Sequence, residues 1–315
     1  MYILRSFLLT LLLGWSIHAL AAELPDHLGA SARVLIVASA EASPQASPQA
    51  TVRASFLAYL RERGLAVEAH LIILNASATA PRLVQQFLPD LIFVQGDRAA
   101  AWVRREIPGI PTVVAMAVDR QTLERDRYAT GVLLGFSLPT QLHWISAALP
   151  AARRVGLLYH TDANRRRLPR LRALATASGI ELVAVEVAAP KDLPAALNDL
   201  LSRVDVLLGM PDDLVLTPQT AKSILLTSFR KKVPFVGPSP NWTQAGALYS
   251  LGWSYRDMGR QCGQQAERLL RGATVASVPL EAPRTAVLSL NLKAAHHMNI
   301  TIPDAVRQRA LQVYE

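Results

Sequence analysis

The chain has 315 residues, of which 51% are hydrophobic and 18% charged, and it contains one cysteine. This length can bury two cores of ordinary domain size, and a lone cysteine excludes a disulfide framework. The net charge of +9 includes a dense arginine group between Arg153 and Arg172, but no aromatic residues interleave it as a base-stacking surface requires. We therefore interpret the group as a solvated helix face or as a docking patch for a membrane partner, not as a nucleic-acid site.

Residues 1–21 have the features of a secretory signal. Arg5 supplies the positive end, Phe7–Leu13 is an apolar core, and Ala19-Leu20-Ala21 fits the cleavage pattern. Removing this segment takes one arginine and no acid, so the charge falls from +9 to +8. No later stretch approaches the roughly 18 apolar residues of a membrane span. We expect a soluble periplasmic protein cleaved after Ala21.

Three strand-like segments occur twice, in the same order. The first set begins at Arg33, Asp90 and Ile110, and the second at Arg154, Asp205 and Val233. Helical patterns lie between these strands, which predicts parallel sheets with crossover helices. We predict an α/β fold of two Rossmann-like lobes with a ligand cleft between them. The expected lobes are residues 31–132 plus 250–283, and residues 133–249 plus 284–315.

Helices and loops complete the prediction. The tandem ASPQ repeat at Ala42–Ala50 is expected to be an extended loop, and a polar loop at His160–Arg167 is expected to precede a helix beginning at Pro169. Cys262 falls on the buried stripe of a long helix, Tyr255–Arg271. Further helices are expected near 52–60, 82–87, 97–103, 140–149, after Pro194 and at 218–231, and further strands at 66–73, 180–187, 247–251 and 286–290.

Signatures of catalysis and of cofactor binding are missing from the sequence. Neither phosphate-binding glycine motif occurs, and no G-x-S-x-G elbow is present. Ser228–Lys231 matches S-x-x-K only within a predicted helix, and His296-His297 lacks the spacing of a metal site. We expect a protein that is not an enzyme, with no catalytic residue, metal or cofactor.

Polar residues at predicted strand ends are the candidate ligand contacts, because ligands of open α/β sheets bind beyond the carboxyl ends of the strands. Asp97 is either a helix N-cap or a contact, Asp212 is either a contact or a structural acid, and Trp242 either stacks on the ligand or fills the lobe interface. The candidates are Ser39, Glu41, Gly96, Asp97, Asp119, Ser137, His160, Thr161, Asp212, Asp213, Ser239, Asn241 and Trp242.

Asp97 and Asp212 occupy equivalent places in the two repeats. If both acids face one closed cleft, a cation is required between them, because like charges disfavour joint ionisation. The sequence thus suggests a ligand with a positive group, such as an amino acid or another amine. The alternative is that Asp97 only caps its helix.

The segments TGVLLGFSLPTQLHWISAALPAARRVGLLYHTDAN (Thr130–Asn164), AGALYSLGWSYRDMGRQCGQQAERLLRG (Ala245–Gly272) and SLNLKAAHHMNITIP (Ser289–Pro303) resemble the ABC-transporter substrate-binding proteins related to the tryptophan/tyrosine-binding TrpX group. The resemblance covers nearly all of the chain after the signal. It implies a type-I periplasmic binding fold that closes on a small ligand, often an aromatic amino acid. By position, Asp212 and Asp119 match two acids of the family.

Three positions depart from the family pattern. Glu41 and the SPQ repeat replace its Glu-His-Pro, Asp97 replaces a threonine, and Arg165 replaces a serine. The resemblance implies delivery of the captured ligand to an inner-membrane ABC permease. Together with the charge argument, we expect a monomer that captures an amino-acid-like or other amine-bearing ligand. The alternative is a periplasmic protein that reports its ligand to a membrane sensor.

Overall fold

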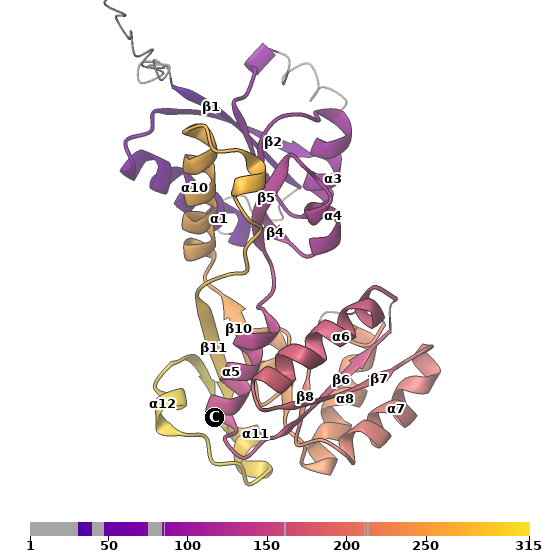
Figure 1. The fold of residues 1–315 in the computed structure, drawn as a ribbon. Coiled ribbons are helices and arrows are strands. Elements are labelled where there is room, and N and C mark those ends of the chain that lie inside the picture. The colour runs from indigo at the N-terminus through magenta and orange to yellow at the C-terminus, as the bar shows by residue number, and fades with distance from the viewer. Residues whose placement is uncertain are drawn as a thin grey trace, which may run out of the picture.

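The computed structural model describes residues 31–39, 47–74, 84, 86–160, 162–210, 212 and 214–315. In Figure 1 they form two α/β lobes joined by extended connections. The expected signal segment and the first part of the ASPQ repeat lie outside the described residues. Among the helices that are described, none combines the length and apolarity needed to span a bilayer.

The first lobe is built on a parallel sheet with strand order β2-β1-β3-β4-β5 in the described residues. Helices cover both faces, so β3 is buried along its whole length and reads as a continuous apolar run. The elements are β1 (Ala32–Ser39), α1 (Pro48–Glu62), β2 (Val67–Leu74), β3 (Leu91–Gln95), α3 (Asp97–Glu106), β4 (Thr112–Ala117), α4 (Arg120–Glu124), β5 (Ala129–Leu133) and, from later in the chain, α10 (Tyr255–Leu270).

The second lobe has strand order β12-β11-β10-β9-β8-β6-β7, again in the described residues, and only its β10–β11 pair is antiparallel. The elements are α5 (Leu138–Ala148), β6 (Arg154–Tyr159), α6 (Asp162–Ala177), β7 (Glu181–Glu186), α7 (Leu193–Leu201), β8 (Val206–Leu208), α8 (Pro218–Lys231), β9 (Phe235–Gly237), α9 (Pro240–Ala245), β10 (Tyr249–Trp253), β11 (Ala286–Asn291), α11 (Leu292–His297), α12 (Asp304–Arg307) and β12 (Ala310–Tyr314), and short 3-10 turns lie at Pro190–Asp192 and Val275–Ser277.

The internal repeat is visible in the sheets, because 2-1-3-4-5 in the first has the same order as 7-6-8-9-10 in the second. A shared contact explains the paired sequence motifs. Asp90 Oδ2 accepts a hydrogen bond from Arg33 N at 2.8 Å, and Asp205 Oδ2 accepts one from Arg154 N at 2.8 Å. In each lobe this aspartate ties the start of the third strand to the start of the first.

The chain crosses between the lobes at 134–137, at Ser254 and between Ser277 and Ala286. The expected boundary at residue 250 differs from this arrangement, since it falls inside β10. The β10–β11 ladder continues to the pair Trp253–Ala286, which places residues 250–253 in the second sheet.

The core of the first lobe depends on a close approach of α10 to α1. A Cβ at Gly259 would lie 2.3 Å from Val52 O, and one at Gly263 would lie 2.7 Å from Tyr59 Cδ1. Cys262 is fully buried beside this contact, as predicted, and burial raises the pKa of its thiol. The glycines therefore allow two helices far apart in sequence to pack together.

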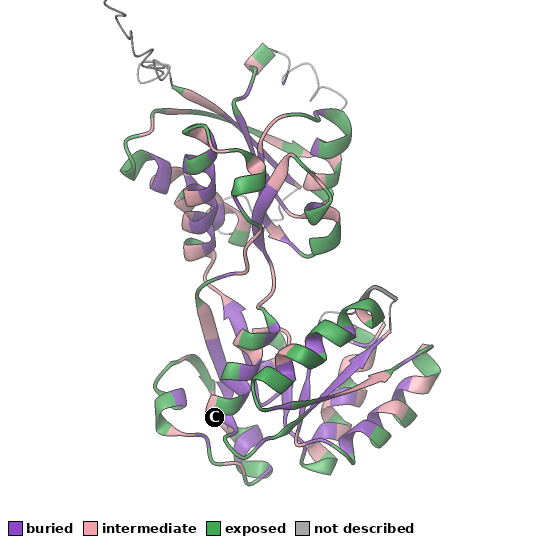
Figure 2. Cartoon of the chain, in the orientation of Figure 1, coloured by how far each residue is buried: buried purple, intermediate pink, exposed green. Residues whose placement is uncertain are grey.

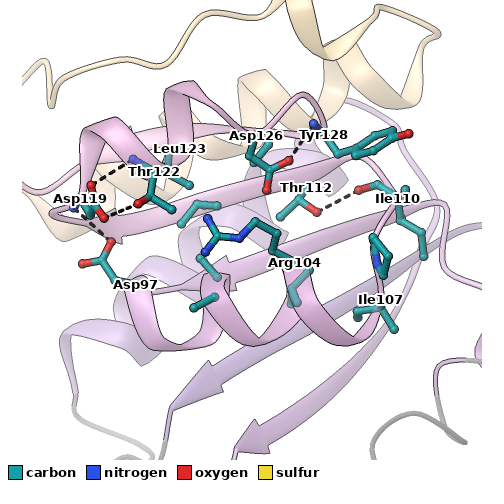
Figure 3. Close-up of a pocket in the computed structure, with 17 residues that line it drawn as sticks. Asp97, Arg104, Ile107, Ile110, Thr112, Asp119, Thr122, Leu123, Asp126 and Tyr128 are labelled. Carbon is teal, nitrogen blue, oxygen red and sulfur yellow. Dashed lines mark hydrogen bonds between the residues drawn. The ribbon is translucent and has the colours of Figure 1, made fainter.

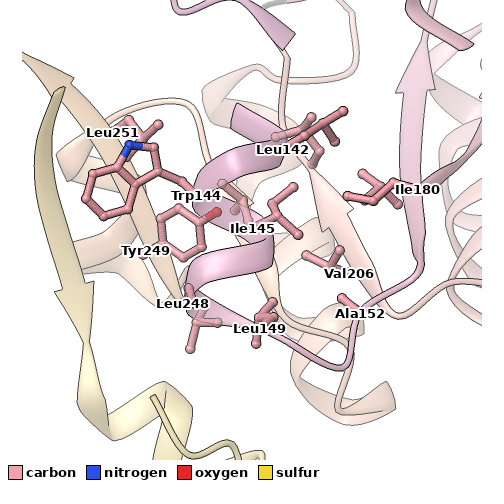
Figure 4. Close-up of a cluster of buried hydrophobic side chains, with 14 of the residues drawn as sticks. Leu142, Trp144, Ile145, Leu149, Ala152, Ile180, Val206, Leu248, Tyr249 and Leu251 are labelled. Atoms are coloured by element: carbon pink, nitrogen blue, oxygen red, sulfur yellow. The ribbon is translucent and has the colours of Figure 1, made fainter. Parts of the chain in front are cut away.

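The core of the second lobe gathers around α5 and β10. Ile145, Leu142 and Tyr249 are fully buried there (Figure 4), and Arg309 covers the Trp144 ring at 4.4 Å. In both lobes the inner strands are buried between helices whose outer faces are exposed (Figure 2), while the edge strands β2 and β12 are mostly exposed. Each lobe thus has its own core.

Two predicted elements were wrong in detail, and one strand was missed. α1 begins inside the ASPQ repeat, because Ser47 caps it by accepting from Ala50 N and Pro48 fits its first turn. α6 begins at Asp162 and contains Pro169, since burial of Leu168 and Leu171 outweighs the local preference. β12 was not predicted, and its exposed Leu311 gives no two-residue alternation of buried side chains.

Candidate ligand-binding cleft

A cavity of about 590 Å³ lies between the lobes. The loop after β4 borders it from the first lobe, and the ends of β8 and β9 with α6 border it from the second. Its volume is within the range of small-molecule sites, about 300–1,000 Å³. Its place beyond the carboxyl ends of parallel strands is where ligands of this architecture bind.

Apolar and aromatic side chains form much of the cavity wall. Phe136, Met210, Leu216 and Trp253 line it from the crossing segments and the second lobe. Val118 faces it from the first lobe with 55% of its surface exposed. An exposed apolar residue in a cleft is a ready contact for the apolar part of a ligand.

Two buried polar atoms in this wall have no hydrogen-bond partner in the described part of the protein. They are Tyr249 Oη and Trp253 Nε1, which lie four residues apart on β10 and so on one face of the strand. Burial raises the pKa of Tyr249, so the phenol stays protonated. Buried donors are rarely left unpaired, so these two side chains of the wall are unusual, although neither polar atom is exposed to the cavity in this structure.

Two arginines line the same cavity from opposite lobes: Arg120 on α4 and Arg167 on α6. Figure 1 shows these helices facing each other across the gap. Arg120 Nη1 donates to Glu124 Oε1 at 2.8 Å. Desolvation by the surrounding protein lowers the pKa of Arg167, and the positive charge of Arg120 lowers it further. Much of the Arg167 side chain is nevertheless exposed.

Asp212 also lines the cavity, but its oxygens serve its own lobe. Oδ2 accepts from His160 N and from Asn164 Nδ2, each at 2.9 Å. Oδ1 accepts from Leu214 N and Val215 N, each at 3.0 Å. Burial acts to raise the pKa of Asp212, but these hydrogen bonds hold it below its usual value. Since a carboxylate has about four lone-pair positions, Asp212 joins the ends of β6 and β8 and retains no free acceptor.

Asp97 and Asp119 do not reach the interlobe cavity. They line a smaller pocket of about 180 Å³ within the first lobe (Figure 3). Asp97 accepts from Val118 N at 2.9 Å and Asp119 N at 3.2 Å, while Gly96 takes the N-cap position of α3. Asp119 caps α4, and hydrogen bonds from Thr122 lower its pKa. Asp97 and Asp212 therefore do not flank one cation in this structure, and Asp97 is not the cap that the sequence suggested.

Ser137 and Ser239 line the cavity and differ in their bonds. Ser137 Oγ accepts from Thr140 N at 3.3 Å and caps α5. Ser239 precedes α9 without a side-chain capping bond. Its hydroxyl is thus the freer of the two for a ligand.

The other candidates do not line this cavity. His160 bonds to Val187 O through Nδ1 at 2.8 Å, and Trp242 packs edge-on against Phe235 inside the second lobe, 5.5 Å between centroids. The remaining described residues of this group are Ser39, Gly96 and Asn241. Glu41, Thr161 and Asp213 lie outside the described residues.

Sequence reasoning missed Arg120, Arg167, Tyr249 and Trp253. Arg120 directly follows Asp119, which strand-end position had singled out, so extending that rule by one residue would have found it. Arg167 belongs to the basic group interpreted as a solvated face, and only the rotation of α6 separates it from its neighbours. Tyr249 resembled an ordinary residue of the predicted strand 247–251, and Trp253 lay beyond that strand.

Comparisons with known proteins agree on one family. Residues 74–314 match the family model described as ABC transporter substrate binding protein. A tyrosine-binding protein of Clostridioides difficile strain R20291 is 22% identical over 218 residues, which is 65% of this chain. The match spans 63% of that relative, less than two thirds of its length.

Solved structures share the fold. A ligand-free, open substrate-binding protein with adhesive properties from Clostridium difficile matches with a TM-score of 0.69 and 19% identity, over 90% of this chain and 99% of the other. An ABC domain in complex with L-Trp from Streptococcus pneumonia matches with a TM-score of 0.56 and 19% identity, over 90% and 100%. The architecture is the type-I periplasmic binding fold.

Proposed function

The chain belongs to the ABC transporter substrate-binding protein family, and from this we propose that it captures a small amino-acid-like ligand between its lobes and delivers it to an inner-membrane ABC permease. The observation that carries the proposal is the interlobe cavity, which combines aromatic walls with unpaired buried polar atoms. Such a site encloses an apolar group and orients it with a few hydrogen bonds.

An aromatic amino acid is the ligand that this cavity supports best. One relative is named a tyrosine-binding protein, and one structural neighbour was solved with L-Trp. In this chain Phe136 and Trp253 line the cavity, and behind its wall the buried Tyr249 Oη has no partner within the described residues. Stacking and edge contacts between rings contribute about 0.5–1.5 kcal/mol beyond burial.

Capture follows from bending at the crossing segments. A ligand shifts the equilibrium toward the closed form only by its differential affinity for that form. Val118 on one lobe and Met210 on the other border the same cavity, so a ligand that contacts both is bound more tightly when the lobes close.

A thermal-shift screen of amino acids, polyamines, sugars and carboxylates tests this function. We expect aromatic amino acids to raise Tm, and small-angle X-ray scattering to show a smaller radius of gyration with the same compounds. If no compound in the panel either stabilises the protein or compacts it, solute capture is wrong.

Location and partner need separate tests. We propose a periplasmic monomer cleaved after Ala21, so mass spectrometry of periplasmic extract should find a chain beginning at Ala22. Reconstitution with a cognate ABC permease and its ATPase should give ligand-dependent ATP hydrolysis. Ligand-dependent output from a membrane sensor instead would favour the sensing alternative.

A further inference from the structure

We propose that Arg120 and Arg167 form a carboxylate clamp, in which the ligand's carboxylate bridges a guanidinium from each lobe and so holds the cleft closed. This inference rests on the proposed capture of a solute between the lobes. It adds the chemical group that the site requires.

The geometry places the two cations for this task. Both side chains line one cavity, yet Arg120 belongs to α4 of the first lobe and Arg167 to α6 of the second. The two helices face each other across the gap (Figure 1). A ligand group between them contacts both lobes at once.

The described residues give these two cations little counter-charge, since one acid, Glu124, attracts both Arg120 and Arg167. Arg167 makes no hydrogen bond or ion pair within the described residues, and the partner of Arg120 there is Glu124 on its own helix. That pair is exposed on both sides and so holds Arg120 weakly. Asp212 is the acid that lines the cavity, and its four hydrogen bonds come from its own lobe.

The guanidinium is the side chain best matched to a carboxylate, because its planar fork donates two parallel hydrogen bonds. Without an anion, the two facing positive charges repel and favour the open cleft. With a carboxylate between them, each lobe gains an attraction that exists only when the lobes are close. This is the differential affinity that closure needs.

The clamp predicts a ligand preference opposite to the cation expected from sequence. The carboxylate is the anchoring group, and the ammonium of an amino acid contributes less. Neither Asp97 nor Asp212 offers a free oxygen toward this cavity for that ammonium.

Matched compounds test the preference by calorimetric titration. One set is L-tryptophan, indole-3-propionate, which lacks the ammonium, and tryptamine, which lacks the carboxylate. A second set is L-tyrosine, 3-(4-hydroxyphenyl)propionate and tyramine. We expect loss of the carboxylate to weaken binding about 10- to 100-fold, and loss of the ammonium to weaken it less.

Variants test the residues with the best-binding carboxylate of these sets. Arg167→Gln and Arg120→Gln should each raise Kd about 10- to 100-fold. Arg166→Gln, the exposed neighbour on α6 that does not line the cavity, is the matched control and should bind as the parent does. Glu124→Gln releases Arg120 and should strengthen binding.

The outcomes separate the clamp from the proposed function. Tryptamine or tyramine binding more tightly than its carboxylate counterpart would overturn the clamp and leave solute capture intact. Equal Kd values for Arg166→Gln and Arg167→Gln, with unchanged melting of both free proteins, would also overturn it. If no compound of the wider screen binds, capture itself fails.

Discussion

At the scale of single residues, Ser137 and Ser239 show that two serines in the same kind of position can have different roles. Both precede a helix in the cleft wall, but only Ser137 caps its helix with Oγ. The capping serine is committed to the fold, and the other is available to a ligand.

We predict that Ser239→Ala weakens ligand binding about 3- to 10-fold by removing one hydrogen bond and leaves the free protein as stable as before. Ser137→Ala should do the reverse and lower the free energy of unfolding by about 1 kcal/mol. Urea unfolding and titration of the two variants side by side measure both effects. A Ser239→Ala protein that binds normally would remove this hydroxyl from the site.

Asp212 is a second case in which the neighbours of a residue decide its role. The sequence left open whether Asp212 contacts the ligand or is a structural acid. For Asp212→Ala the structure predicts a loss of about 1–3 kcal/mol in the unliganded protein, because amide donors of two loops lose their acceptor. Urea unfolding of the free variant measures it, and Asp212→Asn, which keeps one oxygen, should lose less.

The pH dependence gives an independent check on Asp212. Its pKa in the folded protein lies below the unfolded value of about 3.9. Its stabilisation is therefore present above that unfolded pKa and is lost as pH falls through the folded pKa. We expect the stability of Asp212→Asn to fall less than that of the parent between pH 5 and pH 3, measured by urea midpoints. Identical pH profiles would contradict the argument.

At the scale of elements, α10 against α1 is the contact with the least tolerance. Helix propensity alone makes Gly→Ala in a helix stabilising by about 1 kcal/mol. At Gly263 the added Cβ would meet the Tyr59 side chain, and at Gly259 it would meet the Val52 carbonyl oxygen.

We predict that Gly263→Ala destabilises the protein by about 1–3 kcal/mol, and that Gly259→Ala costs more because backbone cannot rotate away. Chemical unfolding measures the change in the free energy of unfolding, and its sign shows whether steric contact or helix propensity dominates. A stabilised Gly259→Ala protein would mean that the helices are further apart than described.

At the scale of the whole molecule, two cores joined by a few crossing segments need not unfold together. Phe56 and Ile145 are fully buried in the first and second core, respectively. Phe56→Ala should cost about 3–5 kcal/mol and Ile145→Ala about 2–5 kcal/mol.

In scanning calorimetry of the ligand-free variants, each substitution should lower the unfolding temperature of its own lobe and leave that of the other lobe unchanged. A ligand bound between the lobes should draw the two transitions together, because it stabilises both lobes. If both variants shift one sharp transition alike, the lobes unfold as a unit.

Much of the architecture could be predicted from the chain itself. The repeated aspartate, apolar run and acid at Asp90 and Asp205 indicated two related units, and Cys262 was placed correctly on the α10 stripe. Such patterns are readable because burial on both faces of a parallel strand, or on one face of a helix, imposes a short sequence period. The start of α6 was not readable, since Pro169 suggests a helix boundary locally and only packing of Leu168 and Leu171 overrides it.

The site was decided by tertiary structure. The sequence places Asp97 and Asp212 at strand ends. The backbone amides that donate hydrogen bonds to them belong to Val118 and His160, which lie 21 and 52 residues away. Arg120 and Arg167 share a cavity because two separately folded lobes meet at the crossing segments. The direction of a carboxylate and the partner of an arginine depend on groups distant in sequence, and the local period of the chain carries no record of them.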